Sequence, residues 1–233
     1  MRILLIAFTL FLSSSLFGTE LNSYHFKKQL MGCDFALIIY SNNAIQAEKA
    51  AGKAFSRIDQ LNDICSDYIS DSELSRLSNT HNQWTPLSLD LWTIINYSQE
   101  LSKRTQGAFD ITCGPLSVQW RIARYRNMHP NPLTIEKALS RCSYKKLELK
   151  ASNHSIRLNT ANMKLDLGAI AKGYAADEAM KDLKQNGIKH AMIDASGDLL
   201  MSPHPKGKWK IFINDNNSTQ SASYIELKEG AVA

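Results

Sequence analysis

The chain has 233 residues, of which 44% are hydrophobic and 21% are charged. This length and composition allow a substantial buried core, which excludes a disordered protein and predicts one globular domain or two small ones. The 27 Lys and Arg residues outnumber the 22 Asp and Glu residues, but the excess is spread along the sequence. Without a basic block, the chain is not expected to bind nucleic acid.

The first 18 residues have the pattern of a cleaved signal peptide. Arg2 precedes the apolar run 3–12, and small and polar residues follow as far as Gly18. The alternative is a membrane anchor. The apolar run is too short for that role, because a span of the bilayer needs roughly 20 residues. We expect an exported protein, periplasmic or peripheral to the inner membrane, whose domain occupies residues 19–233. Thr19 stands where a lipoprotein would have Cys, so lipid attachment is not expected.

The four cysteines lie far apart and lack the spacing of metal ligands, which argues against a zinc cluster. An oxidising compartment would permit disulfides without requiring them. The simplest interpretation treats at least half of them as small buried apolar residues. They are Cys33, Cys65, Cys113 and Cys142.

The spacing of apolar residues predicts four helices, at 47–65, 88–107, 134–142 and about 170–185. In the first, Lys49, Lys53 and Arg57 are expected to face water. Ser88 or Asp90 is a favourable N-cap for the second. A further short helix is expected after Ser70 or Ser72.

Short β-like runs fill much of the remaining chain. They lie at 24–39, where Met31-Gly32-Cys33 interrupts two strands, and at 146–149, 155–158, 191–194, 198–201, 208–213 and 224–227. Helices and strands alternate without a repeat, so the sequence predicts an α+β or layered α/β fold.

The strongest local signal is the segment 165–177, which is predicted to be a strand running through a glycine turn into a helix. Free N–H groups at a helix start attract anions, and Lys172 adds a positive charge there. Asp166 can accept hydrogen bonds from a ligand, while the turn carbonyls can face a hard cation. The alternative role for Asp166 is helix capping.

Two other segments have candidate ligand contacts. In 107–116, Asp110 and Thr112 are predicted to share one side of an extended segment, although Phe109 could instead be core and Asp110 could form an Asx-turn. In the polar stretch 66–79, Tyr68 could stack on a flat heteroaromatic ring. The common Gly-rich phosphate loops are absent, so a nucleotide site would have to be built otherwise.

These segments resemble the ApbE family of flavin transferases, whose members share four motifs in this order. The motifs here are Met31-Gly32-Cys33, Ser66-Asp67-Tyr68 with Ser72-Glu73, Phe109-Asp110-Ile111-Thr112 with Pro115-Leu116, and Asp166-Leu167-Gly168 with Ile170-Ala171-Lys172-Gly173. The resemblance spans about Met31 to Gly197. It implies an ApbE-like α+β fold and magnesium-dependent transfer of FMN from FAD to a Thr or Ser hydroxyl of an exported or membrane redox protein, with release of AMP.

The resemblance also implies roles for individual residues. Lys172 would be catalytic and would contact FAD, and the backbone oxygen of Ala169 would bind Mg²⁺. The other implied FAD contacts are Met31, Tyr68, Ala108, Phe109, Asp110 and Asp166. The acceptor would be a subunit of a membrane redox complex, and the oligomeric state is not implied.

The sequence departs from the family pattern in three places. Cys33 replaces the usual Thr, and Ser196-Gly197 replaces a double glycine. The last residues, 229–233, resemble a strand that continues in relatives, so we expect the domain to be incomplete at its C-terminal end. The alternatives to transfer are an exported FAD-binding protein without catalysis and an FAD pyrophosphatase.

Overall fold

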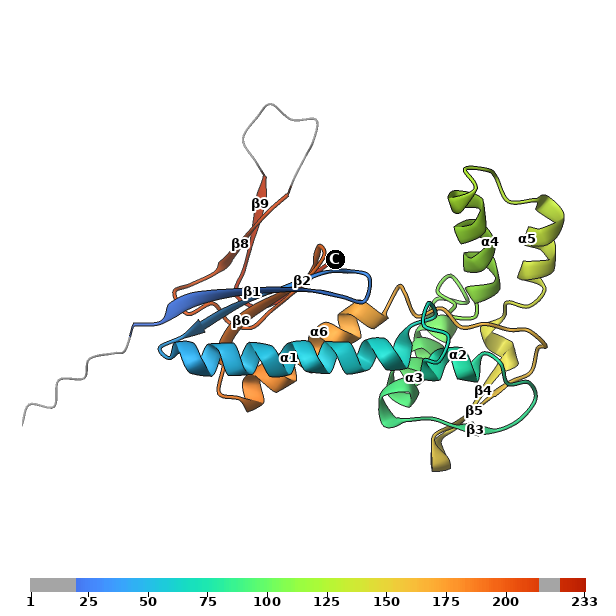
Figure 1. Ribbon diagram of the computed structural model, residues 1–233, viewed down its shortest axis with the longest axis horizontal. Coiled ribbons are helices and arrows are strands. Elements are labelled where there is room, and N and C mark those ends of the chain that lie inside the picture. Colours follow the sequence, from blue (N-terminus) through green and yellow to red (C-terminus); the bar gives the residue numbers. More distant parts are fainter. Residues whose placement is uncertain (1–19, 214–222) are drawn as a thin grey trace, which may run out of the picture.

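The computed structural model describes residues 20–213 and 223–233. The predicted signal peptide, residues 1–18, lies outside them. Within the described ranges, no helix has the length and apolar character needed to cross a membrane. Figure 1 shows two lobes joined by two long helices, α1 (Ala44–Cys65) and α6 (Ala171–Gln185).

The first lobe contains an antiparallel five-stranded sheet in the order β1-β2-β6-β7-β10. Its strands are β1 (Asn22–Leu30), β2 (Cys33–Ser41), β6 (His190–Ala195), β7 (Asp198–Met201) and β10 (Gly230–Val232). A separate hairpin of β8 (Trp209–Phe212) and β9 (Tyr224–Leu227) projects from this lobe (Figure 1).

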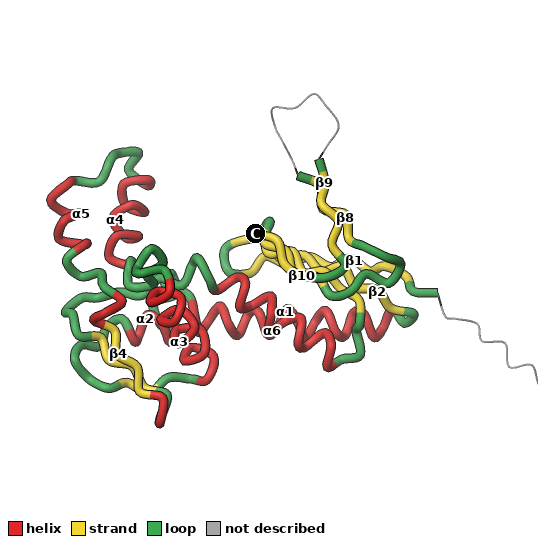
Figure 2. Tube along the Cα trace, turned by 180° about the vertical axis from the view of Figure 1, so that it is seen from behind, coloured by secondary structure: helices red, strands yellow, loops and turns green. Residues whose placement is uncertain are grey.

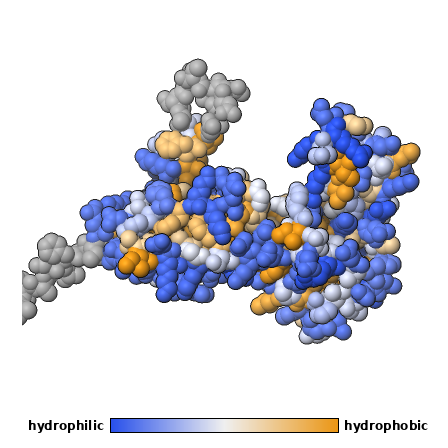
Figure 3. Space-filling view, in the orientation of Figure 1, coloured by the Kyte–Doolittle hydropathy of each residue, from blue (hydrophilic) through white to orange (hydrophobic). Residues whose placement is uncertain are grey.

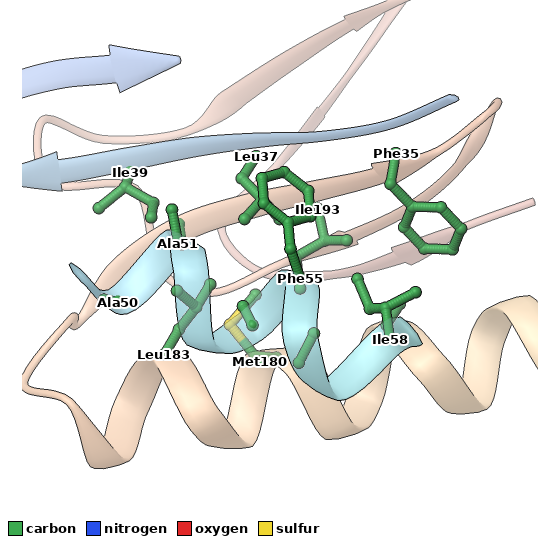
Figure 4. Packing of buried hydrophobic residues seen from close by; sticks show 14 of the residues in the cluster. Phe35, Leu37, Ile39, Ala50, Ala51, Phe55, Ile58, Met180, Leu183 and Ile193 are labelled. Atoms are coloured by element: carbon green, nitrogen blue, oxygen red, sulfur yellow. The ribbon is translucent and has the colours of Figure 1, made fainter. Parts of the chain in front are cut away.

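Helices α1 and α6 cover one face of this sheet, as the views from the two sides show (Figures 1 and 2). The alternating residues Phe35, Leu37 and Ile39 of β2 are fully buried against the helices. Figure 4 shows them packed beside Phe55 and Ile58 of α1 and beside residues of α6. Four buried alanines of α1 let the two helices approach closely; they are Ala47, Ala50, Ala51 and Ala54.

The second lobe combines short helices with a three-stranded antiparallel sheet in the order β3-β5-β4. Its helices are α2 (Glu73–Leu77), α3 (Leu89–Arg104), α4 (Gly114–Tyr125), α5 (Pro132–Leu139), η1 (Tyr144–Lys146) and η2 (Ala151–Asn153). Its strands are β3 (Thr85–Pro86), β4 (Leu147–Lys150) and β5 (Ser155–Leu158). Its separate apolar core includes Leu91, Ile95 and Ile156.

The α+β fold class and most predicted elements are confirmed. Two local predictions are wrong. The segment containing Asp110 and Thr112 is a turn leading into α4. The strand predicted at the start of 165–177 does not form, since only an isolated bridge between Lys164 and Cys113 precedes it. Helix α4 was not predicted because Gly114-Pro115 resembles a chain break, but Pro is well tolerated in the first turn of a helix.

The prediction that Arg57 faces water is also wrong. Its guanidinium group makes two hydrogen bonds to Asp90 of α3, at 2.9 and 2.5 Å, and one to Glu178 of α6 at 3.0 Å. The Tyr174 hydroxyl donates to Asp90 at 2.9 Å. These four side chains, the Arg57 network, join α1, α3 and α6 where the two apolar cores meet.

We expect Arg57→Leu to lower the free energy of unfolding by about 2–4 kcal/mol, because it leaves the largely buried Asp90 without its cation and Glu178 with only Lys181. The hydrogen bonds from Arg57 hold the pKa of Asp90 below its ordinary value of 3.8. The stabilisation is therefore complete above about pH 5 and is lost as the pH falls through the lowered pKa. Urea unfolding at pH 7 and pH 3 measures both effects. Equal stability of the variant and the parent at pH 7 would contradict the role of the network.

Candidate functional site

A cavity of about 710 Å³ lies where three segments of the second lobe meet the start of α6. Tyr68 comes from the loop after α1, Phe109 from the turn before α4, and Asp166 from the segment before α6. Six predicted site residues line this cavity: Tyr68, Ala108, Phe109, Asp110, Asp166 and Ala169. Residues separated by about a hundred positions in the sequence are thus brought together.

Arg121 of α4 connects two of these segments and was not predicted from the sequence. Its guanidinium nitrogens lie 2.5 Å from Asp67 and 3.3 Å from Asp166. The same group lies over the Tyr68 ring, 4.0 Å from its centroid. Tyr68 is 77% exposed, so its other ring face is free to stack on a planar ligand.

The carboxylate of Asp110 is mainly occupied by its own segment. One oxygen accepts hydrogen bonds from the backbone N–H and the hydroxyl of Thr112, at 2.8 and 2.7 Å. The other accepts from the Tyr144 N–H at 2.8 Å. The Asx-turn alternative is therefore confirmed, and Asp110 holds the shape of the cavity wall.

Asp166 stabilises the turn before α6 instead of capping the helix itself. Its Oδ1 accepts from the Gly168 N–H at 2.8 Å, and the helix begins later, after Ile170, without a side-chain cap. Within the described part of the chain, the N–H groups of Lys172 and Gly173 have no hydrogen-bond acceptor, and the Ala169 carbonyl has no donor. The start of α6 therefore offers unpaired N–H groups and the Ala169 carbonyl oxygen to a ligand.

Lys172 and Met31 do not line this cavity. The Lys172 ammonium lies 2.6 Å from Asp198 and 3.4 Å from the Ala195 carbonyl oxygen, at the β6–β7 turn. Met31 lies at the β1–β2 turn with a positive φ of 51° and packs against both apolar cores. Ala169 also lines a second cavity of about 420 Å³, whose lining includes Asp198, the ion-pair partner of Lys172.

The residues at the start of α6 supply only part of the ligand set that a hard cation needs. Among the described residues, no group of three or more His, Cys, Asp or Glu side chains could hold a metal ion. The Ala169 carbonyl oxygen lines the site and accepts no hydrogen bond within the described residues. Because Mg²⁺ usually binds few protein ligands and completes its shell with water and substrate phosphates, this single oxygen is compatible with a magnesium ion bound together with a phosphorylated substrate.

The cysteines have no metal or disulfide role in the described structure, in which all four are free thiols. Burial raises the pKa of the Cys65 thiol to about 12. Burial also raises the pKa of Cys33, although the neighbouring Lys172 ammonium opposes that shift. These thiols are not activated as nucleophiles.

Comparison with known proteins gives a consistent result. The profile of the ApbE family matches residues 31–233. A protein named FAD:protein FMN transferase from Treponema pallidum is 27% identical over 78% of this chain and 55% of its own length. The protein of that name from Vibrio cholerae is 27% identical over 88% of this chain and 62% of its own length. The chain thus spans little more than half the length of these curated relatives.

A solved structure agrees with the sequence comparison. The ApbE protein of Thermotoga maritima superposes with a TM-score of 0.82 over 91% of this chain and 70% of that protein, at 27% identity.

We expect Arg121→Met to lower the melting temperature by about 2–6 °C, because it removes two partly buried ion pairs that join α4 to the Tyr68 and Asp166 segments. Arg124→Met is the matched control, since Arg124 is exposed on the same helix and has no ion pair in the described structure. Thermal unfolding followed by circular dichroism measures both. Equal shifts in the two variants would rule out the bridging role of Arg121.

Proposed function

Since the chain belongs to the ApbE family, we propose that it transfers the FMN half of FAD to a Thr or Ser hydroxyl of another protein and releases AMP. The observation that carries this proposal is the meeting of Tyr68, Phe109 and the Asp166–Ala169 turn in one cavity. An aromatic ring with a free face suits the isoalloxazine ring. The free N–H groups at the start of α6 suit the pyrophosphate.

In the proposed reaction, the acceptor hydroxyl oxygen attacks the phosphorus of the FMN half. A new P–O bond forms to the acceptor, the bond to the bridging oxygen of the pyrophosphate breaks, and AMP leaves with that oxygen. The hydroxyl proton is released to solvent. Such reactions depend mostly on positioning and on stabilising negative charge, because little covalent chemistry is required of the protein.

We assign Lys172 to stabilise charge on the leaving phosphate. Its ammonium is held by Asp198 and the Ala195 carbonyl beside the start of α6. Movement of this ammonium from Asp198 to a phosphate would exchange one ion pair for another. Asp198 is therefore a positioning residue for Lys172.

We further propose that magnesium binds at the Ala169 carbonyl oxygen, which has no donor within the described residues. When bound, magnesium would screen the pyrophosphate charge from the incoming hydroxyl oxygen. This role requires the turn to keep its shape, which the hydrogen bond from Gly168 to Asp166 supports.

The acceptor is proposed to be an exported or membrane redox protein, as a subunit of a redox complex. The support is the signal-like pattern of Arg2 and the apolar run 3–12, which would place this enzyme in the periplasm or at the inner membrane. Secretion of a reporter fused to residues 1–18 tests this placement, and retention in the cytoplasm would reject it.

The decisive assay incubates the chain from residue 19 with FAD, Mg²⁺ and a Thr-bearing acceptor domain, followed by mass spectrometry of the acceptor. We expect a gain of one FMN unit, which is lost when EDTA is added or when the acceptor Thr is changed to Val. Release of FMN and AMP with an unmodified acceptor would identify a pyrophosphatase instead. Bound but intact FAD would identify a flavin-binding protein without transfer.

Two substitutions separate binding from turnover. Asp166→Ala is expected to weaken FAD binding about tenfold, because the turn and the Arg121 contact are both lost. Lys172→Ala is expected to lower turnover about a hundredfold with little change in FAD affinity. Fluorescence titration of FAD gives the affinities, and the mass assay gives the rates. Unchanged flavin affinity in Asp166→Ala would remove this site assignment.

A further inference from the structure

Helices α4 and α5 with their connecting loop, residues 114–142, form a projection that stands away from the rest of the second lobe (Figures 1 and 2). We call it the α4–α5 projection. It carries six of the fifteen large hydrophobic residues that are exposed in the described structure: Trp120, Ile122, Tyr125, Met128, Leu133 and Leu139. Tyr125 is 93% exposed and Trp120 is 54% exposed. Such a concentration on a short segment is typical of a binding surface.

The same projection is strongly basic. It contains four Arg and one Lys against the single acidic residue Glu136. Only Arg121 forms an ion pair there; the other cations, Arg124, Arg126, Lys137 and Arg141, have none within the described residues. Figure 3 shows strongly hydrophilic residues at the end of the projection, next to hydrophobic ones along α4. Unpaired positive charge beside exposed apolar side chains favours a partner with an acidic surface.

A small cavity gives this surface a specific anchoring point. It has a volume of about 420 Å³ and is lined by Trp120, Ile135 and Leu139 with His129 and Pro130 of the loop. Leu139 also lines the main cavity that contains Tyr68 and Phe109. A molecule bound in the small cavity would therefore contact Leu139, which also lines the proposed flavin site.

We propose that the α4–α5 projection is the docking surface for the acceptor protein, which presents acidic side chains to Arg124 and Arg126 and inserts an apolar side chain beside Trp120. This inference rests on the proposed function, since it names the partner of the same site. Because Leu139 lines both the small cavity and the flavin cavity, an acceptor docked here would have its hydroxyl close to the flavin cavity. An apolar anchor surrounded by complementary charge gives both affinity and orientation.

The test measures binding of a labelled, acidic, Thr-bearing domain of a membrane redox subunit by fluorescence anisotropy, and FAD affinity separately by titration. The variants are Trp120→Ala and the double variant Arg124→Glu with Arg126→Glu. The matched control is Lys184→Glu with Lys189→Glu, which makes the same charge change at two exposed lysines of the sheet lobe that have no ion pair within the described residues. Circular dichroism confirms that each variant is folded.

We expect both projection variants to weaken acceptor binding about tenfold or more, while the control and all FAD affinities stay within about twofold of the parent. Acceptor binding that is equal in all variants, or absent in the parent, would overturn the docking surface. Reduced FAD affinity with unchanged acceptor binding would assign the surface to the flavin site and would also overturn it. Because binding is read without catalysis, an acceptor that docks but is never modified would reject the proposed transfer alone.

Discussion

The contact between Arg57 and the carboxylates of Asp90 and Glu178 determines how the two lobes are joined. Helices α1 and α6 each contribute to both apolar cores, and α3 belongs to the second lobe alone. The Arg57 network links all three at the point where the cores meet. Asp90 also lies in the first turn of α3, where a negative charge is favourable. The position of the α6 start, and with it Ala169 and Lys172, follows from this junction.

The main cavity is built largely from side chains that satisfy one another. Asp110 is engaged by Thr112 and Tyr144, and Asp166 by Gly168 and Arg121. The groups that remain available to bind a ligand are therefore the aromatic ring faces and the backbone groups at the start of α6. If FAD binds here as proposed, these groups would hold it without a Gly-rich phosphate loop. It also makes Arg121 a positioning residue, because it fixes the Tyr68 loop against the Asp166 turn.

Much of the fold could be predicted because its signals are local. The apolar spacing of α1 and the Ser88 cap of α3 are visible in sequence, and the structure places both as predicted. The motif residues that gather in the main cavity could be named from the family resemblance. Arg57, Arg121 and Asp198 could not be found, because an arginine or aspartate on a helix or at a turn looks solvent-exposed until its partners from distant segments are known. Helix α4 was missed for a different reason. Gly114-Pro115 looks like the end of a regular element in the sequence, but in the structure it forms the first turn of the helix.

The function proposed for this chain depends on flavin binding in the cavity formed by Tyr68, Phe109 and the Asp166 turn. A crystal structure of the chain grown with FAD tests it most directly. We expect the isoalloxazine ring against the free face of Tyr68 and the pyrophosphate at the N–H groups of Lys172 and Gly173. Flavin bound in another cavity, with this one empty, would show that the Tyr68 cavity is not the flavin site.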